Sequence, residues 1–402
     1  MTAASDEIHI GLLWHSFRSE NLGVGALTVA NINLIAAAVE KAGRLPVFHV
    51  LGVQGDTDYS SETCYRNDFT NIGFKALLNP SSTLHRKMKQ CAVFFDIGAG
   101  DSFSDIYGWK RYSLMLASKY AAVRSGGALI FSPQTIGPFS TARARFSAAR
   151  ALRLSKRVFA RDAQSRTVLD ELGVGARSEL TTDVAFALPY TKAADKDGRD
   201  LAAGRIRVGL NVSALLYRRD IAASDKIALS VDYGPLIDRI IDRLKGDPRV
   251  ELHLVPHVLA AHTAYEDDYA LALTLQQKHP EAIVPPRFGG PSAAKTYIAA
   301  LDFFLGSRMH ATIAAISSGT AVLPLGYSRK FTGLFGSIDY PWTADLTALT
   351  NDAVMAKLDE AMADIPRLAS DAAAAAARAQ EKLGVYTRFL DRIVGELAAG
   401  HA

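Results

Sequence analysis

The sequence predicts two doubly wound α/β domains that face each other across a cleft, followed by a helical C-terminal tail. Short apolar runs alternate with amphipathic stretches from residue 8 onward, which is the pattern of parallel strands covered by helices on both faces. A polar, aperiodic stretch at residues 191–205 interrupts this alternation, which then restarts. A chain of 402 residues is long enough for two such domains.

The first predicted domain, residues 1–190, contains five apolar runs that we interpret as strands. Helical periodicity between these runs predicts four helices, and Asp162 has the residue type of an N-cap for the last of them. The strands are predicted at residues 8–14, 46–52, 92–97, 128–132 and 157–160, and the helices at 25–41, 110–124, 141–155 and 162–172.

The second predicted domain, residues 206–345, repeats this alternation after the linker at 191–205. Its strands are predicted at residues 206–210, 250–255, 283–284, 303–305 and 321–325, and its helices near 231–246, 264–279, 292–300 and 309–318. Residues 346–402 form the helical tail, with an alanine-rich stretch at 372–378. Such a tail can cross back to the first domain.

Composition and motifs exclude several classes of protein. The formal charge of +4, from 45 Lys and Arg against 41 Asp and Glu, is too small for a nucleic-acid binder. Cys64 and Cys91 lack CxxC spacing and no HExxH occurs, so we expect no disulfide framework, no metal and a reducing cytoplasm. The N-terminus is acidic where a signal peptide needs basic residues, and no run of 18 apolar residues occurs, so we expect no export and no membrane span.

Polar side chains follow most of the predicted strands, often beside glycine or proline. Ligands bind doubly wound sheets outside the carboxyl ends of the strands, so these positions form a candidate site. Its members would be His15, Gly98, Gly100, Gln134, Arg161, Asn211, His257, Ser307, Arg308, His310, Tyr327 and Lys330.

Gly98-Ala-Gly100 is a small-residue turn that lets backbone approach a ligand, although an ordinary tight turn has the same sequence. Asp101 and Asp105 follow with i,i+4 spacing, so one helical turn would place both carboxylates on one face. Asp101 is closer to the strand end and is the better candidate for chemistry. Asp105 could equally cap a helix.

Gly306-Ser-Arg-Met-His310 is the most informative segment. Arg308 and His310 follow a strand and open a helix, where N–H groups and the helix dipole favour a phosphate or carboxylate. The structural alternative is that Arg308 pairs with a core carboxylate and that His310 is an ordinary core histidine. For Arg161 the alternative is an ion pair with Asp162, and a structural role for His257 is equally open.

The sequence also contains two clusters of basic residues. Arg143, Arg150, Arg153 and Arg157 have spacings that place them on one helical face, and His85-Arg-Lys-Met-Lys89 is a smaller cluster. A solvated helix face is the default interpretation. The functional alternative is contact with a polyanionic acceptor or with the anionic inner face of the membrane.

Several of these segments together resemble the polysaccharide pyruvyl transferase family. They are Gly98-Ala-Gly-Asp-Ser-Phe-Ser-Asp-Ile-Tyr107, Pro133-Gln-Thr-Ile-Gly-Pro-Phe139, Ala160-Arg-Asp-Ala-Gln-Ser165, Thr182-Asp-Val-Ala-Phe186, Gly306-Ser-Arg-Met-His-Ala-Thr-Ile313 and Tyr327-Ser-Arg-Lys-Phe331. These motifs occur in the family's order and run from about residue 11 to residue 336.

The resemblance implies a GT-B-like fold of two Rossmann-like domains, with the acceptor on the N-terminal and the donor on the C-terminal one. The implied reaction moves the pyruvyl group of phosphoenolpyruvate onto two hydroxyls of a sugar, forming a ketal and releasing phosphate, with no cofactor. Carried over by motif, Arg161, Arg308 and His310 would bind phosphoenolpyruvate. Asp101 would then be the base, with Asp105 as a second carboxylate, and Ser307 and Lys330 would be further donor contacts.

The sequence departs from the family pattern at two places. Ala99 replaces the usual central glycine of the triplet. Asn21-Leu-Gly-Val24 lacks the aspartate of the family's Asn-x-Gly-Asp, which bears on acceptor identity, so Asn21 is grouped with the acceptor-lining residues. Two alternatives remain: a nucleotide-sugar glycosyltransferase, or a catalytically silent sugar-binding scaffold on the same fold. The sequence predicts no oligomeric state.

Overall fold

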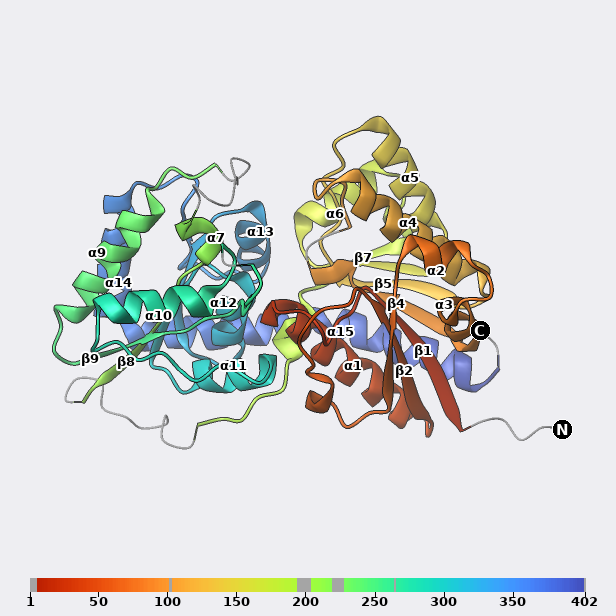
Figure 1. The fold of residues 1–402 in the computed structure, drawn as a ribbon, viewed down its shortest axis with the longest axis horizontal. Coiled ribbons are helices and arrows are strands. Elements are labelled where there is room, and N and C mark those ends of the chain that lie inside the picture. Colours follow the sequence, from red (N-terminus) through yellow and green to blue (C-terminus); the bar gives the residue numbers. More distant parts are fainter. Residues whose placement is uncertain (1–5, 101–102, 194–203, 219–227, 264, 401–402) are drawn as a thin grey trace. The chain divides into compact units, whose positions relative to one another are not determined.

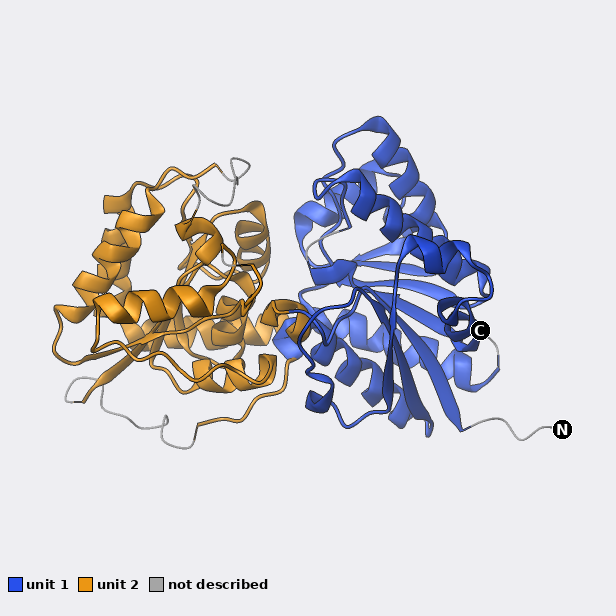
Figure 2. Ribbon diagram, in the orientation of Figure 1, with its two compact units in different colours: residues 1–19, 27–187, 380–402 blue, residues 20–26, 188–379 orange. Residues whose placement is uncertain are grey.

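The computed structural model describes residues 6–100, 103–193, 204–218, 228–263 and 265–400. Its helices and strands form two compact units, each built on a parallel β-sheet (Figure 1 and Figure 2). Unit 1 comprises residues 1–19, 27–187 and 380–402, and unit 2 comprises residues 20–26 and 188–379. The predicted class, a doubly wound α/β fold in each half, is confirmed.

In the described part of unit 1, parallel strands lie in the order β3-β2-β1-β4-β5-β6-β7. The order reverses between β1 and β4, which makes their carboxyl ends the topological switch point. The central strands are buried, as their apolar sequences predict. The strands are β1 (Glu7–Leu13), β2 (Leu45–Gly52), β3 (Asn67–Asn71), β4 (Val93–Asp96), β5 (Ala128–Gln134), β6 (Arg157–Ala160) and β7 (Ser178–Leu180).

Helices cover both faces of this sheet (Figure 1). Val158 and Ala160 of β6 belong to a core cluster with side chains of α3 to α6, whereas Phe159 between them packs on Tyr386 and Phe389, with ring centroids 4.9 and 5.1 Å away. The helices are α1 (Leu22–Lys41), α2 (Phe74–Leu78), α3 (Thr83–Gln90), α4 (Trp109–Arg124), α5 (Ala142–Arg153), α6 (Ala163–Glu171) and α15 (Ile365–Ala398).

In unit 2 the described strands are also parallel, in the order β12-β11-β10-β8-β9, so the switch point lies between β8 and β10. The strands are β8 (Ile206–Asn211), β9 (Val250–Leu254), β10 (Phe303–Gly306), β11 (Ala321–Gly326) and β12 (Ala344–Asp345). The helices are α7 (Ala214–Tyr217), α9 (Tyr233–Lys245), α10 (Asp268–Lys278), α11 (Pro291–Ala299), α12 (Met309–Ser317), α13 (Arg329–Ser337) and α14 (Asn351–Ala363).

The chain passes between the units at more places than the sequence indicates. The boundary predicted at residue 190 lies close to the one at 187/188, but residues 20–26 belong to unit 2. The tail is divided, because α15 begins in unit 2 and its residues from Gln380 onward belong to unit 1. Much of the predicted linker, residues 194–203, lies outside the described residues.

Some predicted elements are wrong in detail. Residues 283–284 do not form a strand, since Ile283 makes a single bridge to His253. The edge strands β3, β7 and β12 were not expected because they are short and lack a continuous apolar run. The four-arginine face is also incorrect: α5 ends at Arg153, and Arg157 lies in β6, 3.4 Å from Glu179.

Helix α1 has the length and composition of a membrane-spanning helix. Its 18-residue window has a mean hydropathy of 1.9, but 78% of that window is buried inside the fold. A helix that is apolar on all sides is the expected occupant of a protein core. Burial inside the fold therefore explains why α1 is rich in apolar residues.

Tyr386 of α15 is tied into unit 1 by a buried hydrogen-bond network. Its hydroxyl donates to Asn31 Oδ1 at 2.9 Å and accepts from Ser132 Oγ at 3.0 Å. Asn31 Nδ2 donates to Ser132 Oγ at 3.1 Å and to His15 Nε2 at 2.8 Å. His15 Nδ1 in turn donates to Leu13 O at 3.1 Å. Matching donors to acceptors around this network leaves His15 as the neutral Nδ1–H tautomer.

We expect Tyr386→Phe to lower the free energy of unfolding by about 1–3 kcal/mol, because it leaves buried Asn31 Oδ1 without its donor and the buried Ser132 hydroxyl without its acceptor. The measurement is the urea midpoint followed by circular dichroism. Tyr265→Phe removes a hydroxyl from a tyrosine that is 39% exposed and should leave the midpoint unchanged. Equal midpoints for both variants would show that the network does not stabilise the fold.

Candidate functional site

The switch point of the unit 2 sheet brings several predicted site residues together. Asn211 ends β8 and pairs in register with Gly306, which ends β10. Ser307 and Arg308 follow directly, and His257 follows β9 on the other side of β8. This is the edge at which doubly wound sheets bind ligands.

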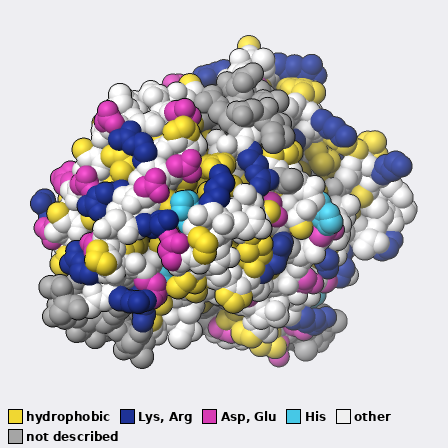
Figure 3. Space-filling view, turned by 60° about the vertical axis from the view of Figure 1, so that its left-hand side comes forward, with side chains coloured by type: hydrophobic (Ala, Val, Ile, Leu, Met, Phe, Trp, Pro, Cys, Tyr) yellow, Lys and Arg dark blue, Asp and Glu magenta, His cyan; other side chains and the backbone are white. Residues whose placement is uncertain are grey.

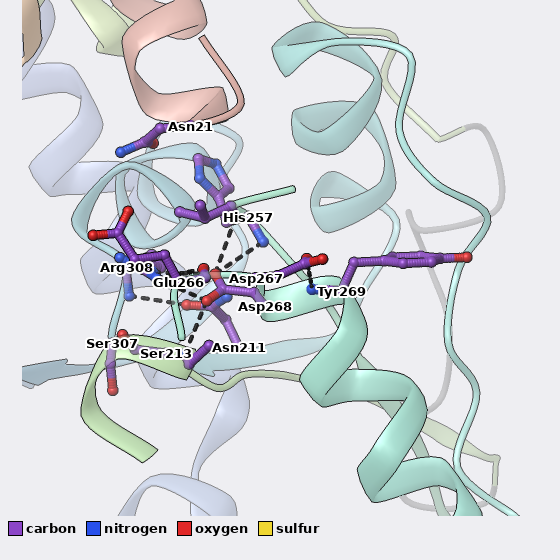
Figure 4. Close-up of polar contacts among 12 residues, drawn as sticks. Asn21, Asn211, Ser213, His257, Glu266, Asp267, Asp268, Tyr269, Ser307 and Arg308 are labelled. Atoms are coloured by element: carbon purple, nitrogen blue, oxygen red, sulfur yellow. Dashed lines mark hydrogen bonds and ion pairs between the residues drawn. The ribbon is translucent and has the colours of Figure 1, made fainter. Parts of the chain in front are cut away.

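Arg308 is fixed by both its backbone and its side chain. It is the N-cap residue of α12, and its amide donates to Asn211 Oδ1 at 2.9 Å. Its guanidinium donates to both carboxylate oxygens of Asp268, at 2.8 Å from Nη2 and 3.1 Å from Nε (Figure 4). Burial disfavours the charged form, but Asp268 outweighs it and raises the pKa of Arg308.

This ion pair matches the structural alternative for Arg308, yet it leaves part of the guanidinium available. Nη2 also contacts Glu266 O at 3.4 Å, whereas Nη1 has no hydrogen bond among the described residues. The side chain is 13% exposed. Asp268 therefore orients Arg308 and offsets its charge while Nη1 can still meet an anion.

Asp268, which pairs with Arg308 after β10, also connects the loops that follow β8 and β9. Its carboxylate accepts from the amides of Ala214 at 2.9 Å, Val258 at 3.0 Å and His257 at 3.4 Å. Ala214 follows β8, and His257 and Val258 follow β9. Sequence reasoning missed Asp268, because an acid in the first turn of a helix usually serves the helix dipole. The one signal was a run of three acids, Glu266-Asp-Asp268.

The N-terminal end of α1 packs onto the same edge of unit 2. Leu22 N donates to His257 O at 3.1 Å, and Asn21 forms an antiparallel bridge with Val258. Asn21 Oδ1 accepts from the amide of Gly23 at 2.9 Å. A Cβ on Gly23 would lie 2.4 Å from His310 Nδ1, so glycine is what allows the imidazole to approach this backbone. The Asn-x-Gly motif thus supports His310.

The remaining predicted residues of unit 2 lie in two settings. Ser307 is fully buried, and its Oγ lies 2.8 Å from the hydroxyl of Tyr233. Tyr327 and Lys330 follow β11, are partly exposed, and Tyr327 packs on Phe331 with ring centroids 5.6 Å apart. Burial lowers the pKa of Arg308 and Asp268 raises it; Tyr327 also raises this pKa, by less than Asp268 does.

In unit 1, Arg161 is buried with only 2% of its surface exposed. Nη1 donates to Asp183 Oδ2 at 2.6 Å and Nε donates to Thr135 Oγ1 at 2.8 Å, while Nη2 has no partner among the described residues. The alternative of an Arg161–Asp162 pair is wrong, since Asp183 is the partner. Asp162 caps α6 as predicted, accepting from Ser165 N at 2.7 Å.

The predicted small-residue turn after β4 is confirmed. Gly98, Ala99 and Gly100 all have positive φ, of 66°, 60° and 79°, and a Cβ on Gly98 would lie 2.3 Å from Gln134 Oε1. Gln134 Nε2 donates to Asp96 O at 2.7 Å. This turn therefore packs against Gln134 at the end of β5, at the switch point of unit 1.

The two predicted carboxylates after this turn are not a helical pair. Asp101 lies outside the described residues. Asp105 precedes α4 in a non-helical segment and accepts from Ser140 N at 2.9 Å and Ser140 Oγ at 2.5 Å. The expected helical turn is thus wrong at Asp105, which links two loops.

His15 also differs from the expected lining residue. It is fully buried in the network around Tyr386. No cluster of three or more His, Cys, Asp or Glu side chains able to hold a metal occurs among the described residues. The described part of the fold thus offers two polar edges, the one around Arg308 and His310 in unit 2 and the one around Arg161 and Gln134 in unit 1.

Comparison with known proteins gives two matches in sequence. The family model described as polysaccharide pyruvyl transferase matches residues 47–329, more than half of the chain. Amylovoran biosynthesis protein AmsJ from Erwinia amylovora is 23% identical over 285 residues, which is 68% of this chain. The match spans 66% of AmsJ, slightly less than two thirds of that curated relative.

Solved structures resemble the whole chain. Anabaena Alr3699/HepE in complex with UDP has a TM-score of 0.57 at 12% identity, covering 98% of this chain and 100% of that one. The S. aureus MnaA–UDP structure has a TM-score of 0.57 at 12% identity, covering 97% and 96%. At this identity the likeness shows the fold alone, and it confirms the GT-B-like architecture of Rossmann-like domains.

Two buried histidines predict a loss of stability in acid. Burial lowers the pKa of His15 and of His257 to about 3, and for His257 electrostatic interactions with His310 and Arg308 add to the shift. Below the unfolded pKa of about 6.5, the unfolded chain binds protons that the folded chain does not. Stability present above pH 6.5 is therefore lost as the pH falls towards 3, by up to about 1.4 kcal/mol per pH unit for each histidine.

We expect His257→Asn to make this pH dependence shallower in urea unfolding between pH 7 and pH 5. His262→Asn, at an exposed position of the same unit, is the control and should keep the original slope. The same slope in all three proteins would contradict a neutral buried His257.

Proposed function

Since this chain belongs to the polysaccharide pyruvyl transferase family, we propose that it moves the pyruvyl group of phosphoenolpyruvate onto two hydroxyls of a sugar in an exopolysaccharide or its precursor. The products are a pyruvate ketal and phosphate. The observation that carries the proposal is the pair Arg308 and His310 at the switch point of unit 2, at the start of α12. The match to AmsJ, named for amylovoran biosynthesis, supports a polysaccharide as the final product.

Phosphoenolpyruvate is a small anion with a carboxylate and a phosphate, and the unit 2 edge has donors suited to it. Arg308 presents Nη1 in a fixed orientation, because Asp268 holds Nε and Nη2. The first bonds of α12 are donated by Ala311 and Thr312 to Arg308 O, so the amides of Met309 and His310 precede the helical ladder. Such a helix start favours an anionic oxygen.

The reaction needs a proton at the methylene carbon and a nucleophile at the adjacent carbon. One sugar hydroxyl adds to that carbon as the methylene becomes a methyl group, phosphate then leaves with the electrons of the C–O bond, and the second hydroxyl closes the ketal. Of the two hydroxyl protons lost, one balances the proton taken up at carbon and the other leaves with phosphate or solvent. We assign His310 as the general acid or as a phosphate ligand.

The other roles follow from the family resemblance. Arg161 is proposed as the second anion contact, Asp101 as the base for an acceptor hydroxyl and Lys330 as an auxiliary anion contact. The scheme uses no cofactor. We place the protein in the cytoplasm, a location supported by the free thiols of Cys64 and Cys91.

We expect His310→Ala and Arg308→Ala to fold and to lose phosphate release from phosphoenolpyruvate and acceptor by roughly 100-fold or more. The measurement is phosphate release at saturating acceptor, alongside thermal shift with phosphoenolpyruvate and with UDP- and GDP-sugars. A protein stabilised by a nucleotide sugar and not by phosphoenolpyruvate would be a glycosyltransferase instead. Stabilisation by sugars alone would indicate a silent scaffold.

A second variant is needed because Arg308→Ala leaves Asp268 buried without its counter-ion, which typically costs about 3–5 kcal/mol. The double variant Asp268→Asn/Arg308→Ala removes both charges and keeps an amide oxygen for the backbone N–H groups of Ala214 and Val258, so it should regain stability without regaining activity. Arg239→Ala, which removes an exposed arginine 2.8 Å from Asp352 in the same unit, is the matched control and should keep full activity. Activity in the double variant would exclude Arg308 from donor binding.

Gly23→Ala tests the positioning of His310 separately. The added methyl group would overlap the imidazole, so the ring must rotate away from its position. We expect a lower kcat with little change in the thermal midpoint, since the ring is partly exposed and can move. Gly234→Ala, where a Cβ meets nothing within 4 Å, is the control. An unchanged kcat in Gly23→Ala would mean that this packing does not position His310 for catalysis.

A further inference from the structure

A group of apolar side chains is exposed on unit 1 where α4 begins and along α5. Ile106 and Tyr107 are each 42% exposed, Trp109 is 44% exposed and Phe146 is 69% exposed. Together with Arg143 and Arg150 they are called the aromatic–basic face. Isolated exposed apolar residues are ordinary, but aromatics interleaved with arginines are typical of a recognition surface.

Side-chain contacts join the two helices into one face. The guanidinium carbon of Arg143 lies 4.7 Å from the centroid of the Trp109 ring, so α5 and α4 meet there. On α5, Arg143, Phe146 and Arg150 have i, i+3 and i+7 spacing and are all exposed. The opposite side of α5 is buried in the core through Ala144, Ala148, Ala149, Ala151 and Leu152.

The charge of α5 is of a single sign. The helix sequence contains four arginines and no acid. Arg145 pairs with Glu171 at 3.2 Å, whereas Arg143 and Arg150 form no ion pair with any residue that the structure describes. On the face drawn in Figure 3, acidic and basic side chains are interspersed.

We propose that the aromatic–basic face docks onto an anionic phospholipid bilayer. Arg143 and Arg150 would contact lipid phosphates, and Trp109 and Phe146 would lie at headgroup depth. Arginine is attracted to the negative potential of an anionic leaflet, and the amphipathic ring of tryptophan partitions to the membrane–water interface. The apolar ring of a phenylalanine on a basic helix face inserts at the boundary between headgroups and acyl chains. A soluble polyanion would satisfy the arginines, but it would not remove Phe146 and Ile106 from water. This inference does not rest on the proposed reaction.

Trp109 provides a direct readout of docking. The chain has three tryptophans, and Trp14 and Trp342 are 3% and 8% exposed, against 44% for Trp109. With vesicles of phosphatidylglycerol and phosphatidylcholine, we expect co-sedimentation and quenching of tryptophan fluorescence by brominated lipid. Pure phosphatidylcholine should give neither. Trp109→Phe should still bind the anionic vesicles but lose the quenching.

The variants separate charge from insertion. Each arginine near an anionic surface contributes about 1 kcal/mol, so Arg143→Gln/Arg150→Gln should weaken vesicle binding about thirtyfold. Phe146→Ser should also weaken binding. Two matched controls lie in unit 2. Arg239→Gln/Arg243→Gln on α9 removes the same charge, and Leu273→Ser on α10 replaces an apolar side chain that is 40% exposed. Both controls should bind the vesicles as the unmodified protein does.

Three outcomes would overturn the proposal: no binding to anionic vesicles, equal weakening by the control variants, or binding without quenching of Trp109. Heparin serves as a soluble polyanion in the same assay. If heparin competes fully and no quenching is seen, the face recognises a charged polymer rather than a membrane.

Discussion

The geometry of the unit 2 edge depends on one buried carboxylate. Asp268 is 1% exposed, and it binds the guanidinium of Arg308 and the amides that follow β8 and β9. A charge in such a place is tolerated only when it is fully hydrogen-bonded. The loops that follow β8 and β9 are therefore held in place by the need to hydrogen-bond this carboxylate. The direction of the Arg308 side chain is likewise set before any ligand arrives. Preorganisation of this kind reduces the cost of binding an anion.

The neighbouring histidine is positioned by a segment from the other end of the chain. Residues 20–26 belong to unit 2 although unit 1 surrounds them in sequence. Asn21 closes the turn by accepting from Gly23, and the missing side chain of Gly23 makes room for His310. Val24, where the family commonly has aspartate, lies in the first turn of α1 and is partly exposed.

Much of this site could be predicted from the sequence because parallel strands align their carboxyl ends. That rule alone brings Asn211, His257 and Arg308 to one edge. The partners of the charged groups could not be predicted, since Asp268 and Asp183 are remote in sequence from Arg308 and Arg161 and are selected by tertiary packing. Buried strands can be predicted because each contains a run of apolar residues. The edge strand β3 has one neighbouring strand and a polar sequence, so no apolar run indicates it.

The chain crosses between the units at 19/20, 26/27, 187/188 and 379/380, so neither unit is one contiguous stretch of the gene. A recombination event that exchanged residues 188–379 with those of a relative would bring in a foreign His310 and keep the resident Gly23. It would also divide α15 between two parents, with Tyr386 remaining on the resident side. The two units of this scaffold are thus expected to change together, by small compensating substitutions rather than by module exchange.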